Sequence, residues 1–201
     1  MNTRGREVAF RRILVALDAS TPSLAALDAA AAVAAKWEAE LLGLFVEDIN
    51  LLQLAALPFT REVGFPSAIQ RPIEPQDIER RLRAQARLSK QALARVAGRF
   101  NLRWSFRTER GQIVTQLLEV AREADLIVLG LRGRKVAGRM PRGAIGQALM
   151  SAASQSLLLM PEDMRIEPPL LVIYDGTPSS RQALAVALRQ AQDGLIVLLA
   201  A

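Results

Sequence analysis

Glycines on either side of a basic segment form the stretch of this chain whose residue types could do chemistry. Gly130 and Gly133 follow the strand expected over Asp125–Leu129, and Gly143 opens a segment with helical periodicity. The segment between them is basic, with side chains from Arg132, Arg134, Lys135, Arg139 and Arg142. Glycine lets a backbone approach a ligand closely, and free N–H groups at a helix start attract anions. We interpret the arrangement as a phosphate-binding loop; the alternative is that the glycines serve only a tight turn and a helix start.

Several other chemistries are excluded by composition. Neither Gly-x-x-x-x-Gly-Lys-Ser/Thr nor Gly-x-Gly-x-x-Gly occurs in the chain. The chain has no histidine and no cysteine, which excludes a Ser-His-Asp triad, cysteine catalysis and disulfides. Hydrolysis would have to rest on Asp18, Glu47 or Asp48 with magnesium, and nothing marks one of them as a dedicated base. An enzyme is therefore the third of the functions considered, after the two set out below.

The elements that must position the glycine loop alternate between strands and helices. Helical segments are expected over Leu24–Lys36, Gln76–Arg99, the residues after Gly111, and Arg142–Ala153. Short apolar runs that read as strands precede or follow each of them, at Arg12–Leu17, Leu41–Val46, Leu102–Thr108, Asp125–Leu129 and Gln155–Met160. This alternation predicts an α/β fold with a doubly wound, Rossmann-like, five-stranded parallel sheet.

The expected strand order, 3-2-1-4-5, places the binding site. Ligands of such sheets bind beyond the carboxyl ends of the strands, where the order reverses. The reversal falls between the strand that ends at Asp18 and the strand that ends at Gly130, more than a hundred residues later. Asp18 and the glycine loop should therefore face one crevice. Ser20 follows Asp18 as a capping hydroxyl for the next helix, with Pro22 at the helix start.

Two further segments have weaker signals. Asp48–Pro75 is expected to hold a short apolar helix up to Pro58 and then an extended connector, either a packed surface loop or a functional lid. The long helix after it should bury one face and leave its arginines in solvent. The residues expected on the buried face are Ile78, Leu82, Leu88, Leu93 and Val96.

The chain begins to repeat itself after residue 169. Leu170–Leu184 echoes Ile13–Leu27, and matched residues such as Asp18 and Asp175 differ in number by 157. We divide the chain into a domain over residues 1–162 and a linker with a partial second repeat, β-α-β, over residues 163–201. So small a unit should either continue into a full second domain or pack on the first domain or on another subunit.

Charge and hydropathy limit the partners. The net charge is +6, but the arginines are scattered and aromatic residues make up only 4% of the chain, which argues against nucleic-acid binding. No stretch of about 18 apolar residues could span a bilayer. The absence of cysteine fits a reducing cytoplasm, and we expect a cytoplasmic protein.

The turn after the first strand carries a resemblance to a known family. The pattern Asp18-x-Ser20-x-x-Ser23, followed by Ala26 and Leu27, joins the glycine spacing in a form similar to the universal stress protein family. The resemblance covers Arg11–Pro161 in element order. Several members of that family bind ATP, and tandem members pair their domains much as single-domain members pair two chains. The resemblance therefore implies an adenine nucleotide, ATP with or without magnesium, and a homodimer formed through the first domain.

The resemblance also implies roles for individual residues. Asp18 would contact the adenosine, the backbone at Val46 the adenine, and Gly130, Gly133 and Gly143 the ribose and phosphates. The remaining candidates for the nucleotide site are Ser20, Arg132, Arg142 and Ala144.

The residue after the last glycine departs from the family pattern. The family has Ser or Thr there, and this chain has Ala144. Loss of a hydrogen bond to a charged group typically costs about 1.5–3 kcal/mol. Charge-assisted contacts from Arg132, Arg134 and Arg142 could offset that loss. Two functions stay open: a stress-response or regulatory protein that binds ATP, and an interaction module of the same fold that has lost nucleotide binding and works through dimerisation.

Overall fold

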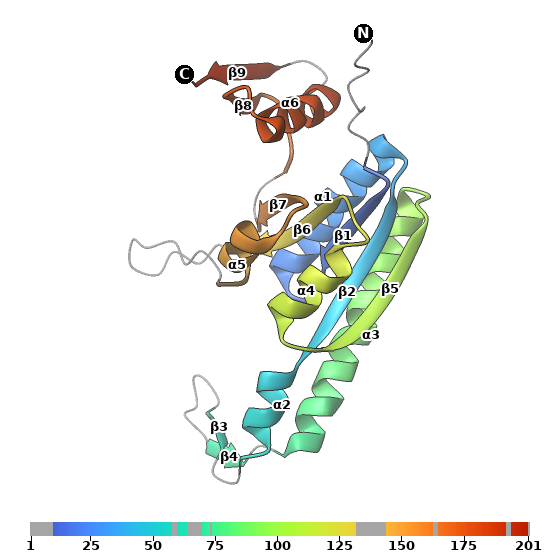
Figure 1. Ribbon diagram of the computed structural model, residues 1–201. Coiled ribbons are helices and arrows are strands. Elements are labelled where there is room, and N and C mark those ends of the chain that lie inside the picture. Colours follow the sequence, from blue (N-terminus) through green and yellow to red (C-terminus); the bar gives the residue numbers. More distant parts are fainter. Residues whose placement is uncertain are drawn as a thin grey trace.

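The computed structural model describes residues 10–57, 60–63, 70–72, 74–131, 144–162, 165–191 and 194–200. Its centre is a sheet of five parallel strands in the order β5-β2-β1-β6-β7 (Figure 1). The strands are β1 (Arg12–Ala16), β2 (Glu40–Asp48), β5 (Trp104–Gly111), β6 (Leu126–Leu131) and β7 (Ser156–Pro161). Counted along the chain without the short strands of the insertion, the order is 3-2-1-4-5, so the predicted α/β fold and strand order are confirmed.

Helices cover both faces of this sheet because alternate residues of each strand are apolar. Ile13 and Val15 of β1 point into a cluster with the helices α1 and α3, and Leu14 points into a cluster with α4 and α5. All three side chains are 0% exposed. The helices are α1 (Thr21–Trp37), α3 (Pro75–Arg99), α4 (Ile113–Ala121) and α5 (Ala144–Ala152). The central strand is thus buried on both faces, as its unbroken apolar run predicts.

The insertion after β2 contains a helix and two short strands. Helix α2 (Ile49–Ala55) packs its Leu52 and Ala55 against Ile78 and Leu82 of α3. Beyond it, β3 (Arg61–Val63) and β4 (Gln70–Pro72) pair antiparallel. The short helix was predicted; the two strands were not, because prolines and polar residues dominate that segment.

Two of the predicted core positions are wrong. Leu88 is 57% exposed, and Ser89 lies at the buried position instead, at 0%. Successive helical residues are rotated by about 100°, so a residue next to a buried position turns away from the sheet. Ala152, expected on the inner face of α5 with Leu149, is exposed for the same reason, whereas Ala153 packs on the core.

The C-terminal segment forms a small βαβ unit of its own. Strand β8 (Leu170–Tyr174), helix α6 (Pro178–Gln190) and strand β9 (Leu195–Leu199) follow one another, and the two strands pair in parallel. We call residues 170–199 the C-terminal unit. Its β-α-β order and its parallel strand pair match the first three elements of the main domain.

Helix α6 joins this unit to the first domain at the end of α1. Lys36 Nζ donates to the carbonyl of Gln190 at 3.0 Å, and Arg189 Nη2 donates to the carbonyl of Lys36 at 3.1 Å. The Arg189 guanidinium also lies over the Trp37 ring, 4.2 Å from its centroid. Each cation therefore meets carbonyls at the negative end of the other helix, which stabilises the contact. The C-terminal unit packs on its own first domain, one of the predicted alternatives.

Candidate functional site

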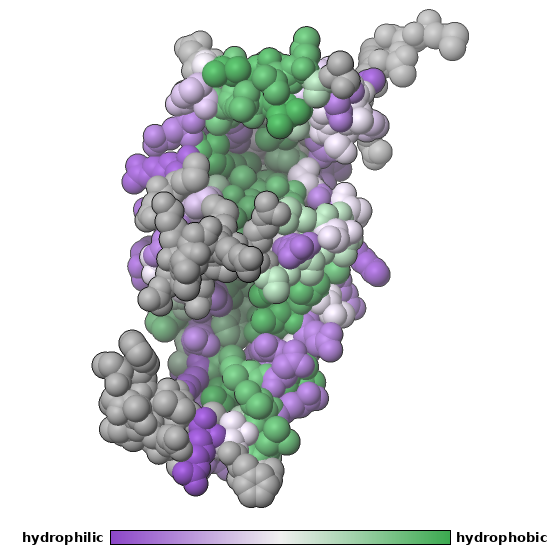
Figure 2. All heavy atoms as spheres, turned by 90° about the vertical axis from the view of Figure 1, so that its left-hand side faces the viewer, coloured by the Kyte–Doolittle hydropathy of each residue, from purple (hydrophilic) through white to green (hydrophobic). Residues whose placement is uncertain are grey.

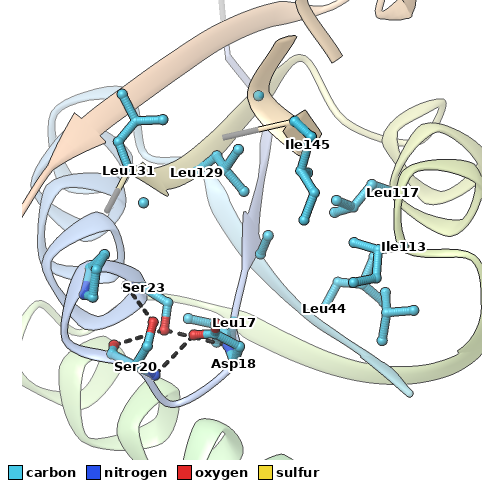
Figure 3. Close-up of a pocket in the computed structure, with 16 residues that line it drawn as sticks. Leu17, Asp18, Ser20, Ser23, Leu44, Ile113, Leu117, Leu129, Leu131 and Ile145 are labelled. Atoms are coloured by element: carbon cyan, nitrogen blue, oxygen red, sulfur yellow. Dashed lines mark hydrogen bonds between the residues drawn. The ribbon is translucent and has the colours of Figure 1, made fainter. Parts of the chain in front are cut away.

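A cavity of about 550 Å³ opens where the carboxyl ends of β1, β2 and β6 meet the start of α5 (Figure 3). This is the point at which the strand order reverses, between β1 and β6. The cavity has a polar end and an aliphatic wall. The polar side chains are Asp18, Ser20 and Ser23, and the aliphatic wall is formed chiefly by Leu44, Val46, Ile113, Leu117, Leu129 and Ile145.

Hydrogen bonds fix the polar end as a tight turn before α1. Asp18 Oδ1 accepts from the backbone N–H of Ser20 at 2.9 Å, and Ser20 Oγ accepts from the N–H of Ser23 at 3.4 Å. Ser23 Oγ donates to the carbonyl of Ser20 at 3.0 Å and accepts from the N–H of Asp18 at 3.4 Å. Between them Ala19 has a left-handed φ of 60°, which is strained for a residue with a Cβ atom. The turn thus holds the Asp18 carboxylate at the cavity edge, as Figure 3 shows.

Gly130 brings β6 against this turn. A Cβ atom on Gly130 would lie 2.3 Å from the carbonyl oxygen of Pro22 and 2.8 Å from the nitrogen of Ser23. Both are backbone atoms, so a side chain at Gly130 would have to displace the start of α1. The glycine therefore has a structural role that the spacing of glycines alone did not indicate: it lets the two walls of the cavity touch.

The fourth wall is the start of α5. Ala144 and Ile145, in the first turn of this nine-residue helix, line the cavity together with Gly146. Free N–H groups at a helix start favour a negatively charged ligand. A hydroxyl at position 144 would add a donor there, and the methyl group of Ala144 supplies none.

The predicted site residues divide into two groups. Asp18, Ser20, Val46, Gly130 and Ala144 line the one cavity. Arg132, Gly133, Arg142 and Gly143 lie outside the described residues. The aliphatic wall was missed, because Ile113 and Leu117 read as ordinary core positions of an amphipathic helix, and Leu117 does serve both purposes at 1% exposure.

The other carboxylates considered for catalysis have structural partners. Glu47 binds Arg110 at 2.7 Å and raises the pKa of that arginine, chiefly through their hydrogen bond. Asp48 Oδ1 caps α2 by accepting from the N–H of Asn50 at 2.9 Å. Within the described ranges, no group of three or more acidic, histidine or cysteine side chains could hold a metal ion. The part of the chain that the structure describes also has no helix both long and apolar enough to cross a membrane.

Comparison with known proteins agrees with the fold and the turn. The model of the universal stress protein family matches residues 9–161. The chain belongs to this family. One universal stress protein of Mycobacterium tuberculosis is 32% identical over 92 residues, which cover 43% of this chain and 31% of that protein. A second is 31% identical over 85 residues, covering 40% and 27% respectively. The aligned part thus spans about a third or less of these relatives.

Solved structures of universal stress proteins share the fold. A family member from Burkholderia pseudomallei is 26% identical, with a TM-score of 0.52 over 75% of this chain and 95% of that one. A universal stress protein from Archaeoglobus fulgidus is 14% identical, with a TM-score of 0.67 over 92% of this chain and 66% of that one. Residues 9–161 are too few to make up 92% of the chain, so the second match extends into the C-terminal unit.

Proposed function

We propose that this universal stress protein binds an adenine nucleotide, ATP, in the cavity between β1 and β6. The observation that supports the proposal best is the convergence of Asp18, Val46, Gly130 and the start of α5 on one cavity. These residues are distant in sequence and meet at the switch point of the sheet, where ligands of such folds bind. The volume of about 550 Å³ lies within the usual range for small-molecule sites.

Each wall of the cavity suits a different part of a nucleotide. The aliphatic wall offers a dry surface for the flat face of a base. The Asp18 carboxylate can accept hydrogen bonds from hydroxyl or amino groups of an adenosine. The N-terminus of α5 favours phosphate groups, with which magnesium would enter. In the cell, ATP occupancy would bias the conformation or assembly of a cytoplasmic stress-response or regulatory protein.

A second function of a different class is an interaction module that binds no nucleotide. Two observations favour it: Ala144 removes a phosphate donor, and the C-terminal unit exposes several large aliphatic side chains. On this reading the cavity is a remnant of the fold and assembly alone carries the function.

Calorimetric titration with Mg-ATP separates the two functions. We expect a binding signal at protein concentrations of about 0.1 mM, and Asp18→Asn should weaken binding by about tenfold or more, as expected for a lost bond to a charged group. Asp175→Asn is the matched control, because Asp175 holds the equivalent turn of the C-terminal unit, and it should leave the affinity unchanged. Absence of heat from the unmodified protein would sink nucleotide binding and favour the interaction module.

The departure at position 144 gives a second measurement. If the missing hydroxyl limits affinity, Ala144→Ser should tighten ATP binding several-fold, because a charge-assisted hydrogen bond is restored. An unchanged affinity would mean that other donors already satisfy the phosphates. The family pattern at this position would then carry no information on the affinity of this chain.

A further inference from the structure

One face of the two-stranded β8–β9 sheet carries four large aliphatic side chains in solvent. Leu171 and Ile173 of β8 are 63% and 62% exposed, and Ile196 and Leu198 of β9 are 52% and 54% exposed. The strand register pairs Leu171 with Ile196 and Ile173 with Leu198, so the four side chains form one flat patch. We call this patch the open face. Figure 2 shows the hydrophobic surface gathered at the top of the molecule, where Figure 1 places the C-terminal unit.

The first repeat shows what this fold normally does with such a face. The offset of 157 puts Leu171 at the position of Leu14, and Leu14 pairs with Leu42 as Leu171 pairs with Ile196. Leu14 and Leu42 are 0% and 1% exposed, because α4 and α5 cover them. In the C-terminal unit, α6 covers only the opposite face, where Val172 is 6% exposed. The open face therefore has the chemistry of a core surface.

We propose that the open face binds the open face of a second copy of this chain. Neither Leu170–Tyr174 nor Leu195–Leu199 contains a charged residue, so two identical faces meet without repulsion between like charges. Two-fold symmetric contacts use the same patch on both subunits, and sheets stack face to face about 10 Å apart. The contact would form four layers: one α6, its sheet, the partner's sheet and the partner's α6.

The position of the unit and the size of the patch set the strength of the contact. Lys36, Arg189 and Trp37 anchor α6 to α1, so the open face is presented on a fixed support and needs no rearrangement to bind. Interfaces below about 1,200 Å² in total belong to weak, reversible complexes, and four partly exposed side chains per copy place this contact in that class. An amphipathic helix of another protein would also suit an aliphatic surface, but a second copy is always present with the first. The association is therefore weak, reversible and dependent on protein concentration.

Sedimentation velocity of the full chain over a range of micromolar concentrations, without nucleotide, tests the proposal. The unmodified protein should shift from monomer to dimer as its concentration rises, and Leu171→Glu should weaken the dimer by at least tenfold. Leu188→Glu is the matched control, because Leu188 lies in the same unit on α6 and is also 63% exposed. It should leave the dimer unchanged. A protein that stays monomeric, or equal effects of the two variants, would overturn the proposal.

Cross-linking gives a readout that does not depend on a destabilising charge. Since the chain has no cysteine, Leu171→Cys and Leu188→Cys each introduce a single thiol. A short bis-maleimide should link two copies through position 171 and not through position 188. Cross-linking at neither position, or preferentially at position 188, would show that copies associate elsewhere or that another partner uses the open face.

Discussion

The chain builds the same aspartate turn twice, and the two copies differ in what surrounds them. In the first copy Asp18 accepts from the N–H of Ser20, and in the second Asp175 accepts from the N–H of Thr177 at 3.0 Å. Ser23 and Ser180 each donate to a backbone carbonyl three residues earlier. The first turn is packed against β6 and lines a cavity, whereas the described neighbours of the second are those of a two-stranded sheet. The turn is therefore a local structure, and the site is made by what packs on it.

The contact at Gly130 is the part of the site that only the first copy has, and filling it should have the largest effect. Gly130→Ala should lower the free energy of unfolding of the first domain by about 3 kcal/mol, because the methyl group would overlap the backbone of Pro22. Urea unfolding measures this loss. The matched control is Gly146→Ala in the same cavity, where a Cβ atom would have its nearest neighbour at 3.6 Å and should be tolerated. Equal stability of the two variants would contradict the packing role of Gly130.

The sequence predicted the sheet order and the meeting of Asp18 with Gly130 because both follow from topology. Apolar runs identify parallel strands buried on both faces, and their order brings the ends of β1 and β6 together. The tight contact of Gly130 with Pro22 was not predictable, since it depends on the distance between two elements far apart in sequence. The docking of Arg189 on Trp37 was missed for the same reason. Leu88 was misplaced because a hydrophobic residue next to the buried stripe looks like part of it.

Removing the helix cap should separate the two copies by where the loss is felt. Ser20→Ala and Thr177→Ala each delete a side chain that accepts from the N–H of the third residue after it. Each should cost about 1 kcal/mol, the usual value for an N-cap. Ser20→Ala should lower the stability of the first domain, and Thr177→Ala should speed amide hydrogen exchange only within the C-terminal unit. Faster exchange throughout the first domain after Thr177→Ala would mean that the two parts unfold together.

The residue after each aspartate should respond with opposite signs. Ala19 and Gly176 occupy equivalent positions, with left-handed φ values of 60° and 78°. Glycine adopts this conformation without steric cost, whereas alanine does not. Ala19→Gly should therefore stabilise the first domain by about 0.5–1 kcal/mol, and Gly176→Ala should destabilise the C-terminal unit by a similar amount. Chemical denaturation measures the first change and hydrogen exchange the second. Changes of the same sign in both variants would refute the equivalence of the two turns.

The smallest effect concerns the charge of the second turn. Hydrogen bonds from the Thr177 hydroxyl, at 2.6 Å, and from its N–H lower the pKa of Asp175 to about 2. Because this folded-state pKa lies below the ordinary value of 3.8, the carboxylate stabilises the turn fully above about pH 4. That contribution is lost as the pH falls from about 4 to about 2, and neutral pH is unaffected. Carbon-13 NMR titration of the Asp175 carboxyl should give a midpoint near 2, and Thr177→Ala should raise it towards 3.8. A midpoint near 3.8 in the unmodified protein would mean that the second turn is open in solution and resembles the first only in sequence.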